Sequence, residues 1–169
     1  KENVAVGYRA LQYNQSYNGM VAIGFESMSN FTSEYNSWDQ NNTAANQLAY
    51  ATSKDGFNTA VGYQSLKGSA TITSNTGLYN TAIGYQTLYG TTTGQQNVAV
   101  GIQSLFTNST GNYNNAIGYQ AMYANTSGQM NDAYGYQALN GVTSGSSNVG
   151  LGGYAGNAIT TGTNNTLIG

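Results

Sequence analysis

A nine-residue motif that returns along the whole chain constrains the fold more than any other feature of the sequence. In its clearest copy, residues 97–105, it reads Asn-Val-Ala-Val-Gly-Ile-Gln-Ser-Leu around a central glycine. From Gly84 onward the centres recur every 17 residues, and such a fixed period is the signature of a repeat protein. The central glycines are Gly7, Gly24, Gly62, Gly84, Gly101, Gly118, Gly135 and Gly152.

The spacing of the copies separates an irregular part from a regular part. Residues 1–79 contain longer connections and a degenerate copy centred on Asn46, whereas residues 80–169 keep the period strictly. We expect residues 1–169 to form a single repeat domain. Because Gly169 stops inside a motif and Asn3 begins one without a polar cap before it, we also expect this chain to be a fragment of a longer fibre.

The composition excludes several classes of partner. Only 6% of residues are charged, and the net charge is −2. A chain with so little positive charge offers no electrostatic footprint for nucleic acid. No run of about 18 apolar residues is present, so we expect no membrane insertion. Cysteine, histidine and proline are absent, which removes disulfides from the prediction.

The length of one repeat and the positions of its two glycines predict the shape of a coil. Seventeen residues with two glycine-marked breaks are too few for a stable helical hairpin and suit two short strands joined by two turns. Counted from the central glycine, position −1 is mostly β-branched, which favours a buried strand face. Position +4 forms a second apolar file, with Leu105 as an example. We predict an all-β parallel β-solenoid (β-roll) of about ten coils with a 17-residue repeat.

Identical polar and aromatic residues are predicted to form ladders between coils. Stacked coils place equivalent residues about 4.8 Å apart, so amide side chains can bond one above another. Asn97 at −4 and Gln103 at +2 represent two such files, and Tyr85 at +1 represents an aromatic one. The small residue at −2, usually alanine, indicates that another backbone comes close. Because so thin a coil has little core of its own, we predict a parallel homotrimer associated through this alanine file.

The motif resembles repeats of known fibrous proteins. The Asn-x-Ala-Ile/Val-Gly pentads are similar to those in the β-roll heads of trimeric autotransporter adhesins. The longer form, residues 80–88 followed by Thr92-Thr93-Gly94, resembles repeats in bacteriophage tail-fibre shafts. The resemblance implies a trimeric fibre that is extracellular, on a cell surface or on a virion. This repeat adds a Tyr-Gln-x-Leu segment to the autotransporter pattern, which leaves the handedness of the solenoid open.

Residues that could carry catalysis or bind a metal are sparse. Without histidine or cysteine there is no Ser-His or Cys-His pair and no ordinary zinc site. We therefore expect no enzyme activity, no cofactor and no metal. The carboxylates are scattered over different coils, and Glu34 with Asp39 is the one close pair on one loop. The six are Glu2, Glu26, Glu34, Asp39, Asp55 and Asp132.

A long connection after Gly24 is the best candidate for a surface-binding loop. It carries Phe31, Tyr35 and Trp38 beside Glu34 and Asp39. Amphipathic aromatic side chains on an exposed loop suit a cell-surface glycan or protein partner. Alternatively, the same rings cover the degenerate coil that follows, and the sequence leaves both interpretations open.

The functional expectation follows from the repeat and its resemblance. We expect a structural and adhesive fibre segment, a rigid trimeric spacer of a phage tail fibre or bacterial surface adhesin used in host or surface attachment. An alternative is a self-assembling extracellular filament subunit of the functional-amyloid kind, because amide ladders with few charges describe that class too. An ice-binding protein is a further alternative, based on hydroxyl pairs such as Thr92 and Thr93.

Overall fold

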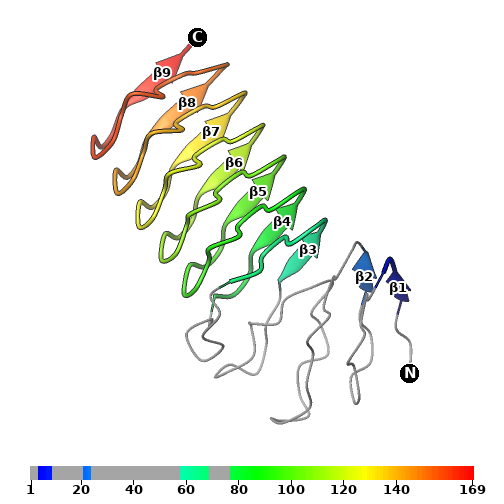
Figure 1. Ribbon diagram of the computed structural model, residues 1–169. Coiled ribbons are helices and arrows are strands. Elements are labelled where there is room, and N and C mark those ends of the chain that lie inside the picture. The colour runs from blue at the N-terminus through cyan, green and yellow to red at the C-terminus, as the bar shows by residue number, and fades with distance from the viewer. Residues whose placement is uncertain (1–3, 9–20, 24–57, 69–76) are drawn as a thin grey trace.

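The computed structural model describes residues 4–8, 21–23, 58–68 and 77–169 (Figure 1). Within these ranges the chain consists of three-residue strands joined by turns and bends, and it contains no helix. The strands are β1 (Val4–Val6), β2 (Val21–Ile23), β3 (Thr59–Val61), β4 (Thr81–Ile83), β5 (Val98–Val100), β6 (Asn115–Ile117), β7 (Asp132–Tyr134), β8 (Val149–Leu151) and β9 (Thr166–Ile168).

Each strand pairs in parallel with the equivalent strand of the next coil. β1 pairs with β2, and β3 to β9 form one seven-stranded sheet in sequence order. The register joins equivalent residues, so that Ala99 faces Ala116 and Ala116 faces Ala133. Figure 1 shows the coils of β3 to β9 stacked along one axis. The predicted parallel β-solenoid with a 17-residue repeat is thus confirmed, while the total of about ten coils remains a prediction.

The second half of a coil is not the strand that the sequence predicted. After the central glycine the chain turns, and positions +2 and +4 adopt positive φ, 53° at Gln103 and 50° at Leu105. The segment still bonds to both neighbouring coils. The Gln103 N–H donates to Tyr85 O at 2.8 Å, and the Leu105 N–H donates to Ala121 O at 3.0 Å. These hydrogen bonds offset the roughly 1–2 kcal/mol that a left-handed residue costs.

The core inside each coil is narrow and lies between the strand and this turning segment. Its two apolar files are the alanines at −2 and the larger side chains at +4, all at most 1% exposed. These residues are Ala60, Ala82, Ala99, Ala116, Ala133, Leu66, Leu88, Leu105, Met122 and Leu139. The buried +4 file was predicted correctly, and so was a backbone close to the alanine.

Two sequence predictions were wrong about which face of the strand points into the core. Position −1 was expected to be buried, but Ile117 is 41% exposed, whereas Ala116 beside it is 0% exposed. Since neighbouring strand residues point to opposite faces, burying the alanine turns position −1 outward. The close backbone is therefore the opposite wall of the same coil. A buried alanine file cannot carry contacts between chains, so the predicted route to a trimer is wrong.

The predicted asparagine ladder lies inside the solenoid. At one rung, the Asn114 Nδ2 donates to Gly128 O at 2.8 Å and to Asn97 Oδ1 at 3.2 Å. The backbone N–H of Asn114 donates to the same Oδ1 at 3.0 Å. Each amide therefore joins three consecutive coils, and its polar atoms are satisfied although the side chain is 0% exposed. The rungs are Asn58, Asn80, Asn97, Asn114, Asn131, Asn148 and Asn165.

A glutamine ladder and two aromatic stacks run along the same axis. The glutamines at +2 bond Nε2 to Oε1, and one such contact, Gln137 to Gln120, measures 2.8 Å. The predicted aromatic file at +1 contains stacked pairs but is interrupted by Ile102. A second stack at +5, which the sequence analysis missed, consists of Tyr89, Phe106 and Tyr123, with ring centroids 4.9 and 5.1 Å apart.

The two glycines of each coil are required for different reasons. The central Gly118 has φ +139°, and a Cβ there would also collide with the carbonyl oxygen of Gly135. The second glycine, such as Gly111, is not at positive φ, but a Cβ would collide with Gly128 O and with the side chains of Asn108 and Asn125. Glycine is therefore needed at the centre for its conformation and at both positions for the close approach of the next coil.

We expect Gly118→Ala to destabilise the protein by on the order of 3 kcal/mol, because alanine is strained at this φ and its methyl group enters the next coil. Gly153→Ala is the matched control, since the nearest atom to a Cβ at Gly153 is Tyr136 O at 4.0 Å. Urea unfolding followed by circular dichroism measures both. Equal unfolding midpoints for the two variants would contradict this account of the central glycine.

Asn114→Asp is expected to cost on the order of 3 kcal/mol at neutral pH, because a carboxylate cannot donate to Gly128 O or Asn97 Oδ1 and is buried there. Asn164→Asp introduces the same change at an exposed position and should be nearly neutral. Thermal unfolding compares the two variants. The ladder would not be a main source of stability if both variants melted like the unmodified protein.

Candidate interaction surface

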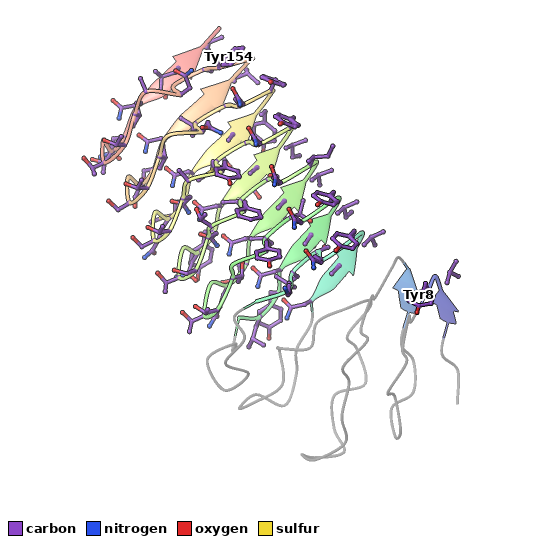
Figure 2. All side chains as sticks on the ribbon, in the orientation of Figure 1. Tyr8 and Tyr154 are labelled. Atoms are coloured by element: carbon purple, nitrogen blue, oxygen red, sulfur yellow. The ribbon has the colours of Figure 1, made fainter. Side chains whose placement is uncertain are left out.

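The side of the sheet that points away from the core is the most distinctive surface of the described structure. We call it the outer face and define it by positions −3 and −1 of β3 to β9. Its −1 file consists of large apolar side chains, and five of them are 38–77% exposed. The file contains Val61, Ile83, Val100, Ile117, Tyr134, Leu151 and Ile168. Figure 2 shows side chains projecting outward along the whole sheet.

The local sequence explains why this file stays outside. Alternation along a strand forces −1 outward once asparagine at −4 and alanine at −2 have taken the inner positions. The interior is narrow at position −2, because even a Cβ added at Gly150 would lie 2.7 Å from Leu139 Cγ and 3.0 Å from Ala155 O. The outer apolar file is thus a by-product of a core that holds alanine or glycine at position −2 in β3 to β8, whereas β9 has Leu167 there, close to Gly156 at +4 of the preceding coil.

The outer face is almost without charge. Position −3 is half-buried in β3 to β8 and carries threonine, valine or asparagine, except for Asp132. The Asn115 Nδ2 donates to Asp132 Oδ1 at 2.7 Å, so this carboxylate is held within the file. Among the described residues the other charged side chain is Lys67. Its Nζ lies 4.9 Å from the centroid of the Tyr89 ring and donates a hydrogen bond to the Tyr89 hydroxyl at 2.9 Å.

A tyrosine file at +1 lies just beyond the central glycines. Tyr85, Tyr119 and Tyr136 are 45%, 39% and 48% exposed. In the coil centred on Gly152, position +1 is Gly153, and Tyr154, labelled in Figure 2, occupies position +2. A hydrogen bond with Tyr154 raises the pKa of Tyr136 above its ordinary value, and partial desolvation and the neighbouring phenols act in the same direction. The Tyr136 phenol is therefore neutral at physiological pH.

The hydroxyl residues before the second glycine have a structural role. The Thr92 Oγ1 donates to Ser109 O at 3.0 Å, and the N–H groups of Thr92, Thr93 and Gly94 converge on the same oxygen at 3.0–3.1 Å. The first hydroxyl of each pair is therefore bonded to the next coil.

The described residues contain little else that could carry chemistry. They hold no group of three or more metal-ligating side chains, and Asp132 is their single carboxylate. The acceptor asparagines Asn108 and Asn125 of two Asn-x-Ser/Thr triplets are buried, and Asn125 Nδ2 donates to Asn108 Oδ1 at 2.7 Å. These two asparagines are consequently inaccessible for glycosylation.

The predicted loop and one predicted repeat centre lie outside the described residues. They are Phe31, Glu34, Tyr35, Trp38, Asp39 and Gly24. The remaining predicted centres each adopt positive φ, between 118° and 139°. The outer face was not among the predicted sites, although its signal, a large apolar residue at −1 in every copy but the degenerate one centred on Asn46, was visible in the sequence.

No helix in the described ranges is long and apolar enough to cross a membrane. Comparisons with protein-family models, with curated proteins and with solved structures found no match to this chain. The candidate surface therefore has to be interpreted from its own chemistry.

The Thr91 hydroxyl is the one buried side-chain polar atom without a partner among the residues described. The same position of a later coil holds Val142, which is fully buried. We expect Thr91→Val to stabilise the protein by about 1 kcal/mol, since valine has a similar shape and no polar group to desolvate. Val142→Thr is the converse control and should destabilise. Urea unfolding midpoints measure both, and a lower midpoint for Thr91→Val would contradict the assignment.

Proposed function

We propose that the protein is a structural and adhesive fibre segment, a rigid spacer that associates as a parallel homotrimer. In this proposal it belongs to a phage tail fibre or a bacterial surface adhesin, works outside the cell or on a virion, and holds a recognition element away from the particle. The observation that carries the proposal is the outer face, a continuous and nearly uncharged surface with an apolar −1 file along a stack of hydrogen-bonded coils.

The interior of the stack suits a mechanical role. Each coil is tied to the next by backbone hydrogen bonds on both walls and by asparagine and glutamine ladders. Bending would stretch these bonds on one side of the rod, so the ladders favour stiffness. The buried asparagines and the glutamines at +2 thus bond along the stack and serve this framework.

The outer face supports association of identical chains. Exposed apolar surfaces that continue over many residues mark sites of protein association. With strands about 4.8 Å apart, the seven strands span roughly 29 Å along the axis. A second copy of the chain has the same spacing and the same nearly neutral −1 and −3 files, so parallel copies can pack in register along the whole length. We propose that the trimer forms here, in place of the alanine route predicted from the sequence.

One feature also favours the alternative function, a self-assembling filament. In the asparagine and glutamine ladders, the amide groups of each coil form hydrogen bonds with the equivalent amides of the next coil, as in cross-β assemblies. Such a filament would grow end to end, whereas the proposed spacer associates side by side. The two functions therefore differ in how assembly depends on protein concentration.

We expect Ile117→Asp to keep the fold, since this side chain is 41% exposed, and to shift the protein from trimer to monomer by burying a charge at the interface. Ser144→Asp adds the same charge to an exposed turn and should leave the trimer intact. Light scattering and sedimentation equilibrium measure the mass of each variant.

A stable folded monomer of the unmodified protein at micromolar concentration would overturn the trimer. Filaments that lengthen with concentration, and that Ile117→Asp does not prevent, would favour the self-assembling alternative.

A further inference from the structure

Two pairs of tyrosines in the +1 file lie face to face across neighbouring coils. Tyr63 and Tyr85 have ring centroids 5.2 Å apart and planes within 9° of parallel. Tyr119 and Tyr136 have centroids 5.0 Å apart and planes within 10°. Tyr85, Tyr119 and Tyr136 are 39–48% exposed, so a small oxidant in solution can reach them.

The other tyrosines of the described coils lack this arrangement. Tyr89 and Tyr123 each stack on Phe106, which separates them. Tyr134 occupies the −1 file, where the equivalent neighbours are aliphatic. Tyr136 and Tyr154 are close, with centroids 5.1 Å apart, but their planes meet at 63°, so that an edge of one ring faces the other ring. Tyr63–Tyr85 and Tyr119–Tyr136 thus differ from these neighbours in stacking two phenols in parallel.

We propose that Tyr63–Tyr85 and Tyr119–Tyr136 are sites of oxidative carbon–carbon cross-linking, each forming a dityrosine bridge between adjacent coils. The co-reactant is a one-electron oxidant such as a haem peroxidase with hydrogen peroxide. Each phenol gives one electron to the oxidant and one proton to water, leaving two phenoxyl radicals. A bond then forms between one ring carbon ortho to each oxygen, and the hydrogens on these two carbons move to the oxygens.

The stacked geometry suits the bond-forming step. The unpaired electron of a phenoxyl radical occupies the π system, so two parallel rings already face each other along the direction in which the bond forms. The ring centroids lie 5.0–5.2 Å apart, so the rings must tilt toward each other to bring two ortho carbons together as they couple. The pair as a whole loses two electrons and two protons, so the product is lighter than the chain by two hydrogen atoms per bridge.

A bridge of this kind would tie the solenoid across its coils. The chain has no cysteine, so disulfides cannot supply such a tie. A covalent bond between residues 119 and 136 closes a loop of one coil and restricts the unfolded chain, as other cross-links do. The proposal does not depend on trimer formation, because each pair lies within one chain.

The sequence supplies a direct test. Lys67 lies between Tyr63 and Tyr85, and Asp132 lies between Tyr119 and Tyr136. After treatment with peroxidase and hydrogen peroxide, the protein is denatured and cut by a lysine-specific protease in one sample and by an aspartate-specific protease in another. We expect dityrosine fluorescence, a single-chain mass lighter by two hydrogen atoms per bridge, and fragments that stay joined across Lys67 and across Asp132.

Matched variants separate the pairs from general oxidation. Tyr136→Phe should lose the joining across Asp132 and keep the joining across Lys67, whereas Tyr85→Phe should do the reverse. Both keep a ring in the stack, as Phe106 does naturally, and circular dichroism checks their fold. Tyr123→Phe is the control and should keep both bridges. Bridges that form only between separate chains, that map to other tyrosines, or that persist in Tyr136→Phe across Asp132 would overturn the proposal.

Discussion

Hydrogen bonding between a residue and its own equivalent in the next coil is the constraint on which the whole structure depends. An amide side chain carries both a donor and an acceptor, so a file of asparagines can satisfy itself without a second residue type. The backbone follows the same rule, because Ala99, Ala116 and Ala133 face one another in parallel register. Since every coil is the template for the next, the sequence must repeat with a fixed period wherever the ladders run.

This constraint also explains the unusual composition. A charged file would place like charges about 4.8 Å apart along the axis, which is unfavourable even near the surface. Neutral amides, hydroxyls and phenols avoid that repulsion and can still bond along the stack. Asp132 is tolerated within its file because the neighbouring Asn115 donates to it at 2.7 Å. The near absence of charge is thus a condition of stacking and carries no information about a ligand.

The sequence was sufficient to predict the features that depend on periodicity. It was not sufficient to predict which strand face points inward or where the backbone adopts positive φ. The repeat, the parallel stacking, the amide ladders and the buried +4 file were all predictable from identical residues at a fixed spacing. The outward direction of Ile117 was not, because alternation shows which residues share a face and leaves open which face is inside. The prediction of a second strand was wrong because Gln103 and Leu105 adopt positive φ and bond to two different coils. Local sequence preferences do not indicate such a conformation.

The asparagine and glutamine ladders have a direction as well as a register. In the bonds between equivalent amides, the nitrogen donates toward the N-terminal coil and the oxygen accepts from the C-terminal one. The asparagine nitrogen also donates to a backbone oxygen of the C-terminal coil. The side-chain dipoles of both files therefore add along the axis, as peptide dipoles do in a helix. A rod built from such coils is electrically polar although it is nearly uncharged. A coil inserted in the reverse sense would meet donors with donors, so every coil along the solenoid must run in the same direction.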